Sequence, residues 1–129
     1  MAGAVILTPS GCSIGADEET PRAAEAPAGV AAAVSRLERA TAERDYATIC
    51  DDLFTAAARR RAGGADCARL VRSAAREIEE PSIEITGISV HGAQATVRVR
   101  TTAAGQRQVA DSLQLRRGPD GWRIEALGG

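Results

Sequence analysis

Residues 82–127 read SIEITGISVHGAQATVRVRTTAAGQRQVADSLQLRRGPDGWRIEAL, and apolar side chains recur there at every second position. The clearest run lies in residues 95–100, where Ala95, Val97 and Val99 alternate with one threonine and two arginines. Such alternation is typical of a strand with one buried and one solvated face. Turn-forming residues divide the stretch at 91–92, 103–105 and 118–121. The pattern therefore predicts a four-stranded antiparallel meander.

The first predicted strand changes parity in its middle. Ile83 and Ile85 share one face of a regular strand, whereas Ile88 and Val90 would share the other. One extra residue in the strand would bring all four side chains to the same face. We therefore expect a β-bulge at Thr86-Gly87, since a glycine inside a strand often marks one.

The last two predicted strands each carry an apolar face. The face of the third strand consists of Val109, Leu113 and Leu115, and that of the fourth consists of Trp122, Ile124 and Ala126. Because Trp122 is in phase with Ile124, we expect it to be buried against the helices that precede the sheet.

Upstream of Pro81 the apolar period changes to about 3.6 residues, which predicts amphipathic helices. The stripes are Val30, Val34, Leu37 and Ala40/Thr41, then Tyr46, Ile49, Cys50 and Leu53, and finally Cys67, Leu70, Val71, Ala74 and Ile78. We expect Asp45 and Asp66 to cap the second and last of these helices. A short turn over residues 55–61 should end at Gly63-Gly64. The predicted fold class is α+β, with N-terminal helices packed on a curved four-stranded antiparallel meander over residues 28–129.

Cys50 and Cys67 both fall on core-facing stripes of neighbouring helices, 17 positions apart. This placement predicts a disulfide between the two helices. The alternative is two buried free thiols that act as small apolar side chains. Their spacing does not fit a redox Cys-x-x-Cys motif, and the single histidine, His91, is expected at a hairpin tip. We therefore predict no metal site and no cofactor.

The chain begins MAGAVILTPSGC, a short apolar run followed by small residues and Cys12. This resembles the end of a bacterial lipoprotein signal, with residues 1–12 as a truncated signal and Cys12 as the lipidated residue. Residues 13–27 are rich in alanine, proline and acidic side chains, which predicts a disordered tether. The resemblance implies an extracytoplasmic protein anchored to the cell membrane by lipid. The alternative is a disordered N-terminus with an accidental cysteine.

Composition excludes one class of partner. The chain of 129 residues has 16 basic and 17 acidic side chains, a net charge of −1, and three aromatic residues. It therefore lacks both the basic field and the stacking platform that nucleic-acid binding requires, and we expect no nucleic-acid partner. All its basic residues are arginine, a bias that indicates a GC-rich bacterial genome.

Several short segments, together with the order of the elements, resemble the nuclear transport factor 2-like and ketosteroid isomerase-like superfamily. These segments are Glu43–Tyr46, Cys50, Ala56–Arg59, Gly63–Cys67 and Arg116–Ile124. The chain is most similar to small exported or lipid-anchored members, in which a like-placed cysteine pair occurs. The resemblance implies a cone-like sheet bent around the helices, with a pocket between them. It also implies a binding or interaction module without catalysis, for an unidentified small molecule or protein.

Asp111 is the sharpest candidate site residue. It has the parity of Val109 and Leu113, so on a regular strand it points toward the apolar face, where a carboxylate could serve as a general base or hydrogen-bond acceptor. The alternative is that the strand begins nearer Ser112, or carries a bulge, and leaves Asp111 solvated. An isomerase or cyclase with Asp111 as base would need an oxyanion donor as well. Tyr46 is the one tyrosine, and its helical stripe explains it as a core residue.

Three further clusters of charged residues can be interpreted either as functional sites or as ordinary solvated surface. A basic face for anionic lipid headgroups, or solvated helix surface, would comprise Arg59, Arg60, Arg61, Arg69, Arg72 and Arg76. The outer face of the sheet, which either meets solvent or pairs with a second copy in a homodimer, would comprise Arg98, Arg100, Arg116, Arg123 and Glu125. Asp51-Asp52 is too sparse for a metal site.

Overall fold

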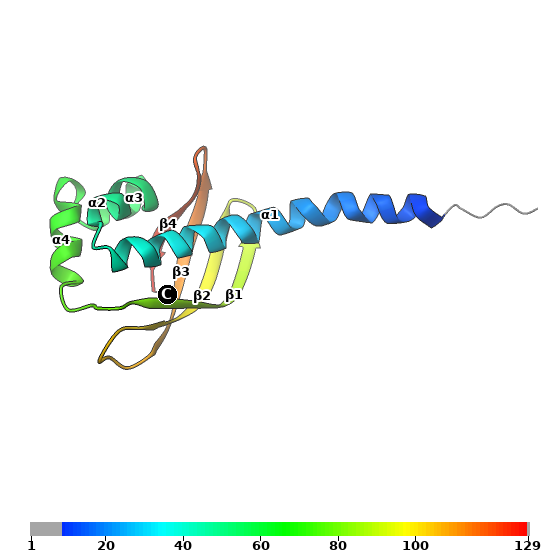
Figure 1. The fold of residues 1–129 in the computed structure, drawn as a ribbon. Coiled ribbons are helices and arrows are strands. Elements are labelled where there is room, and N and C mark those ends of the chain that lie inside the picture. Colours follow the sequence, from blue (N-terminus) through cyan, green and yellow to red (C-terminus); the bar gives the residue numbers. More distant parts are fainter. Residues whose placement is uncertain (1–8, 129) are drawn as a thin grey trace, which may run out of the picture.

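The structure is a computed structural model that describes residues 9–128, with side chains from Ala26 to Gly128. The chain is an α+β fold in which helices come first and a sheet follows (Figure 1). The helical half comprises α1 (Pro9–Ala42), α2 (Tyr46–Thr48), a π-helical turn η1 (Ile49–Leu53), α3 (Ala56–Arg61), a 3₁₀ turn η2 (Gly64–Asp66) and α4 (Cys67–Ala74). The strands are β1 (Ser82–His91), β2 (Gln94–Thr102), β3 (Val109–Gly118) and β4 (Gly121–Leu127).

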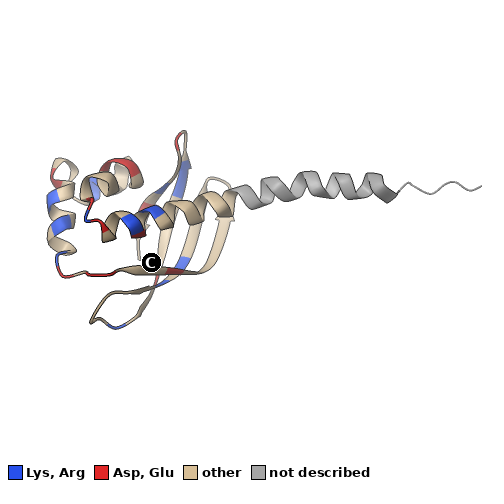
Figure 2. Ribbon diagram, viewed as in Figure 1, with Lys and Arg blue, Asp and Glu red and all other residues tan. Residues whose placement is uncertain are grey.

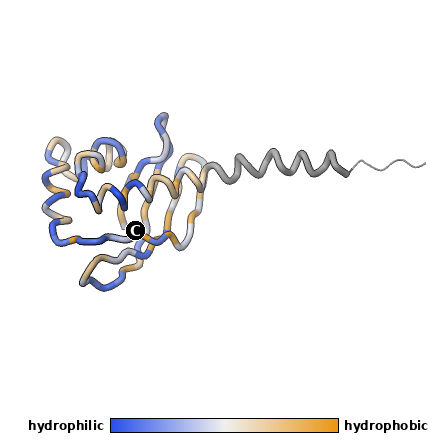
Figure 3. Tube along the Cα trace, in the orientation of Figure 1, coloured by the Kyte–Doolittle hydropathy of each residue, from blue (hydrophilic) through white to orange (hydrophobic). Residues whose placement is uncertain are grey.

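The four strands form one antiparallel sheet in the order β1-β2-β3-β4, which confirms the predicted meander. Two-residue turns at Gly92-Ala93 and Pro119-Asp120 join the outer hairpins. The turn predicted at 91–92 is shifted by one residue, because His91 still pairs with Gln94 at the end of β1. Helix α1 crosses one face of this sheet, η1 and α3 contact β4, and α4 packs on α2 and η1 (Figure 1). Hydrophobic and hydrophilic residues alternate along the strands (Figure 3). In β2 the inner residues Ala95, Val97 and Val99 are almost completely buried, and they form the centre of the core.

A bulge in β1 keeps the apolar side chains of this strand on one face of the sheet. The register shifts between Ile85 and Gly87, so that Thr86 is the extra residue. Ile85 then pairs with Val99 and Ile88 with Val97, which places the apolar side chains of β1 on one face. The predicted bulge is confirmed.

A second bulge, in β4, corrects the predicted facing of that strand. Ile124 pairs with Leu115, but Ala126 pairs with Gln114 and Leu127 with Leu113. Glu125 is therefore the extra residue, and the inner face of β4 continues with Leu127 instead of Ala126. The prediction for Ala126 is wrong because the bulge reverses parity after Ile124.

Helix α1 packs its predicted stripe onto the sheet, with Val30 and Val34 at 0% and 2% exposure. Its end is a Schellman motif, because the N–H of Asp45 donates to the carbonyl of Ala40 and that of Arg44 to Thr41, at 2.8 and 3.1 Å. Arg44 takes the left-handed position at φ 59°, where glycine is usual. The helix also holds the edge strand, since the carboxylate of Glu38 accepts a 2.6 Å hydrogen bond from the N–H of Ile83.

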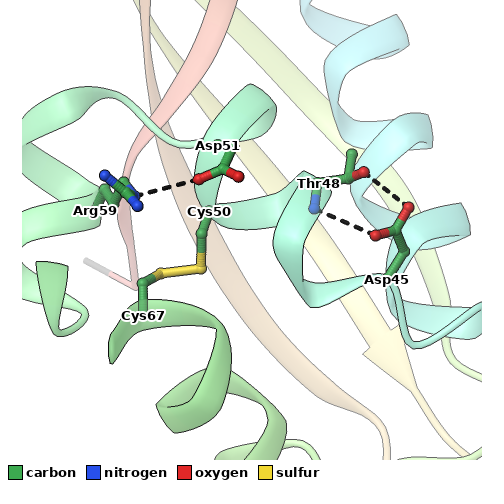
Figure 4. The surroundings of a disulfide bond; sticks show 6 residues. All are labelled: Asp45, Thr48, Cys50, Asp51, Arg59 and Cys67. Atoms are coloured by element: carbon green, nitrogen blue, oxygen red, sulfur yellow. Dashed lines mark hydrogen bonds and ion pairs between the residues drawn. A yellow bond between two sulfur atoms is a disulfide. The ribbon is translucent and has the colours of Figure 1, made fainter. Parts of the chain in front are cut away.

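One of the two predicted caps is confirmed and one is wrong. The carboxylate of Asp45 accepts from the N–H of Thr48 at 3.3 Å and from its hydroxyl at 2.7 Å, which caps α2 (Figure 4). Asp66 occupies the cap position of α4, but its side chain makes no capping hydrogen bond. It pairs with Arg69 at 3.5 Å instead.

Helix α4 is shorter than predicted, and its buried face differs. It ends at Ala74, so Ile78 lies in the following linker. The residues that face the core are Cys67, Val71 and Ala75, whereas Leu70 is 42% exposed and Ala74 is exposed. Leu70 lies instead over Gly63. The φ of 124° at Gly63 is not helical, so this residue separates α3 from α4.

The free edge of β4 is covered by the segment between η1 and α3. Phe54 forms a parallel bridge with Ile124, and the N–H of Thr55 donates to the Ile124 carbonyl at 2.9 Å. Arg123 reaches around this edge to the carbonyls of Asp51 and Phe54, at 3.1 and 3.4 Å. Its register with Arg116 gives it the predicted outer facing, but its guanidinium bonds to the helical layer and does not remain over the sheet.

Trp122 is on the inner face of β4, as expected, but it is only half-buried. It lies over Gly29 of α1, where a Cβ would come within 3.0 Å of its Cδ1 atom. The guanidinium of Arg117 also lies over the ring, 5.7 Å from its centroid. The ring is one of the partly buried apolar side chains that pack against the core.

Helix α1 begins at Pro9, so it includes the segment 13–27 for which composition predicts a tether. Residues 1–8 of the predicted signal, and the side chain of Cys12, lie outside the described part of the chain. The division into signal, tether and domain stays a prediction. Among the described helices, we find none with the length and apolar character needed to cross a membrane.

Candidate functional site

A cavity of about 390 Å³ lies between the helices and the inner face of the sheet. One wall comes from α1, η1, α4 and the linker after α4, through Leu37, Thr41, Ile49, Val71, Ala75 and Ile78. The other comes from the strands, through Ile83, Val99, Thr101, Val109, Leu113 and Leu127. Both walls are mostly apolar, so the cavity suits a small ligand that is itself mostly apolar.

The loop between β2 and β3 forms one rim of the cavity and is tied to the linker that follows α4. The N–H of Ala104 donates to the carbonyl of Glu79 at 2.8 Å. The side-chain amide of Gln106 donates to the carbonyl of Glu77 at 3.3 Å. Gln106 and its neighbour Arg107 both line the cavity. These bonds hold the polar rim against the helical layer.

Asp111 lines the cavity, and it is also exposed to solvent. It pairs with Val99 across the β2–β3 ladder and faces inward, as its parity predicts, because β3 begins at Val109. It nevertheless stays solvated, as in the alternative interpretation, because this end of β3 forms the mouth. One carboxylate oxygen, Oδ1, accepts a 2.8 Å hydrogen bond from the N–H of Ser112.

Two apolar side chains at the mouth are left open. Val109 is 51% exposed and Leu127 is 60% exposed, and both line the cavity. The expected burial of Val109 is therefore corrected, because the helices described in residues 9–128 leave that end of the inner face exposed.

Tyr46 is 4% exposed and packs in the core. It does not line the cavity that Asp111 lines. The structure therefore does not bring these two candidates of the catalytic hypothesis together.

A disulfide joins Cys50 of η1 to Cys67 of α4, with an S–S distance of 2.01 Å (Figure 4). The predicted bond is thus present, and the interpretation as free thiols is wrong. Both cysteines are buried, at 2% and 1% exposure. Because η1 supplies Ile49 and α4 supplies Val71 to the cavity wall, the bond fixes two parts of that wall to each other.

The arginines of the helical half do not form an uninterrupted basic face (Figure 2). Arg59 pairs with Asp51 at 3.3 Å, Arg69 pairs with Asp66, and Arg61 contacts both the carbonyl and the carboxylate of Glu125. Arg60, Arg72 and Arg76 are exposed. On the outer face of the sheet, Arg100 approaches Glu84 at 4.0 Å and Arg116 approaches Glu125 at 3.9 Å.

Within residues 26–128, no group of three or more metal-ligating side chains is close enough to hold an ion, and Asp51-Asp52 is no exception. Sequence reasoning missed the polar cavity residues Thr101, Gln106 and Arg107. Thr101 shares the parity of Val99, which is the signal that could have placed it on the inner face. Gln106 and Arg107 lie in the loop before β3, where strand alternation gives no signal.

Comparisons with protein-family models, with curated proteins and with solved structures each gave no match to this chain.

Proposed function

We propose that this protein is a non-catalytic binding module that takes a small, mostly apolar molecule into the cavity between its helices and its sheet. The cavity carries this proposal. Its volume of about 390 Å³ lies in the range of small-molecule sites, and its walls are apolar with a few polar groups at one rim. A ligand that fills the cavity would gain van der Waals contacts with its apolar walls.

In this proposal, the helices and the sheet are arranged as in a nuclear transport factor 2-like domain. Helices that precede an antiparallel sheet, lie on its inner face and leave a pocket there are what the sequence resemblance implies. We also propose that the domain is exported and is anchored to the cell membrane by a lipid on Cys12. The disulfide supports an extracytoplasmic location, because such bonds are rare in reducing compartments. Intact mass of the protein from its native membrane fraction should show a lipid adduct, and an unmodified Cys12 would refute the anchor.

A catalytic role, as an isomerase or cyclase with Asp111 as general base, has one observation in its favour, since Asp111 lines the cavity. The role also needs a second polar group that converges with the carboxylate. Tyr46 is buried away from the cavity, and among residues 26–128 the hydrogen bond to Asp111 comes from the adjacent N–H of Ser112. The binding role therefore has the better support.

The proposal is tested by a substitution on the sheet that fills the cavity with a large side chain. Thr101 lies on the inner face of β2 and lines the cavity, so a tryptophan at this position would occupy the ligand volume. Calorimetric titration with 1-octanol, a neutral apolar probe, should give saturable binding to the wild type and little or none to Thr101→Trp. Arg100→Trp is the matched control, because residue 100 is adjacent and points to the outer face.

The control should bind octanol as the wild type does. Equal octanol binding by both tryptophan variants, or no saturable binding by the wild type, would refute the proposed function. Circular dichroism and thermal melts of each variant establish that a loss of binding is not a loss of the fold.

A further inference from the structure

The mouth of the cavity combines one carboxylate with uncovered apolar surface. Asp111 lies on the inner face of β3, two residues from Val109 and beside the pair Leu113–Leu127. Val109 and Leu127 are 51% and 60% exposed. A ligand that fills the cavity and covers these side chains must therefore also cover, or lie against, the carboxylate.

Covering Asp111 has a consequence for the chemistry of the ligand. Within the described part of the chain, no arginine, histidine or other cation lies within 4.0 Å of this carboxylate. The N–H of Ser112 donates to Oδ1, and Oδ2 accepts no hydrogen bond from the described residues. Removing a carboxylate from water without a compensating donor is strongly unfavourable. The ligand must then bring a donor or a positive charge to this position.

Arg107 is a cation on the same rim, but it does not require the ligand to carry a negative charge. It lies in the loop before β3, is exposed, and carries a long side chain that can keep its guanidinium in water while its stem stays on the apolar rim. A ligand can enter without desolvating it. The backbone position of Asp111 is fixed in the sheet, and its side chain is too short to move away.

We propose that the ligand of this cavity is an organic cation, with an apolar body in the cavity and one protonated amine against Asp111. This inference rests on the proposed function. It adds a recognition residue and a charge preference to an otherwise apolar site. Asp111 acts here as the partner of a bound cation and transfers no proton.

Three probes with eight carbon atoms each isolate the charge: octylamine, 1-octanol and octanoate. At neutral pH the amine is protonated and the carboxylate is ionised. In calorimetric titrations of the wild type, octylamine should bind about two- to fivefold more tightly than octanol, the size expected for a partly solvated ion pair. Octanoate should bind more weakly than octanol, because Asp111 repels it.

Asp111→Asn should remove the preference for octylamine over octanol, because the amide keeps the shape and loses the charge. Asp52→Asn is the matched control, since Asp52 is exposed and does not line the cavity. It removes the same charge from the protein and should keep the preference.

Equal affinity of the wild type for octylamine and octanol would overturn this inference, and so would an Asp111→Asn variant that still prefers the amine. In both cases saturable octanol binding would leave the proposed function intact. If none of the three probes binds saturably, the proposed function fails and this inference fails with it.

Discussion

The absence of a side chain at position 29 allows the single tryptophan to lie against α1. A Cβ on Gly29 would be 3.0 Å from Cδ1 and 3.3 Å from Nε1 of Trp122. These distances are shorter than ordinary van der Waals contact, so the ring must shift to admit even a methyl group. The cation–π contact with Arg117 depends on the present position of the ring.

We therefore predict that Gly29→Val lowers the free energy of unfolding by about 1–3 kcal/mol, the usual cost of overpacking. Denaturant unfolding followed by tryptophan fluorescence measures the loss. Ala28→Val is the control, because Ala28 is an exposed neighbour on the same helix and should lose only about 0.5 kcal/mol of helix propensity. Equal losses for the two variants would contradict the packing of Trp122 on Gly29.

Asp111 and Trp122 show where residue-scale prediction from sequence ends. Parity correctly placed both side chains on the inner face of the sheet. Parity carries no information on how far the helices extend over that face, so it could not give the exposure of Asp111 or the half-burial of Trp122. Exposure depends on tertiary packing, which no local pattern encodes.

Among the elements, α4 depends most on a covalent link. It has eight residues, too few for an isolated helix to be stable, and its buried face is limited to Cys67, Val71 and the adjoining Ala75. The disulfide to η1 supplies the stability that this small buried face cannot provide. Since α4 forms part of the cavity wall, the bond stabilises the site as well as the fold.

Replacing both Cys50 and Cys67 by alanine should lower the free energy of unfolding by about 2–4 kcal/mol. It should also weaken octanol binding, because α4 is then released from η1. Urea unfolding and calorimetry measure the two effects. A thiol reductant should destabilise the wild type by a similar amount and leave the double variant unchanged. An unaltered stability of the double variant would refute the structural role of the bond.

The two bulges explain why one strand was predicted well and another poorly. In β1, isoleucines and valine on either side of Thr86 make the change of parity visible in the sequence. In β4, Ala126 and Leu127 are both apolar, so a regular strand through Ala126 and a bulged strand through Leu127 fit the same letters. The helix boundaries of α4 had the same ambiguity, because Ile78 continues the helical spacing beyond the end of the helix.

At the scale of the whole molecule, the sequence predicted the fold class, the order of the elements and the disulfide. A pocket was expected only from the family resemblance, and the residue pattern itself could not predict the cavity. A cavity arises from the distance between two packed layers, and alternation within a strand gives only the layer to which a residue belongs. The polar rim needs in addition the docking of the β2–β3 loop on Glu77 and Glu79, two contacts between segments far apart in the chain.

The central claim is that the space between the helices and the sheet is a ligand site. Its most direct test is a titration of the isotope-labelled protein with 1-octanol, followed by amide and methyl chemical shifts in NMR spectra. The claim predicts saturable shifts that are largest at cavity residues from both layers, such as Leu37, Val71 and Leu113, with little change at Arg98 and Ser89 on the outer face. Shifts that do not saturate, or that are as large on the outer face as in the cavity, would contradict it.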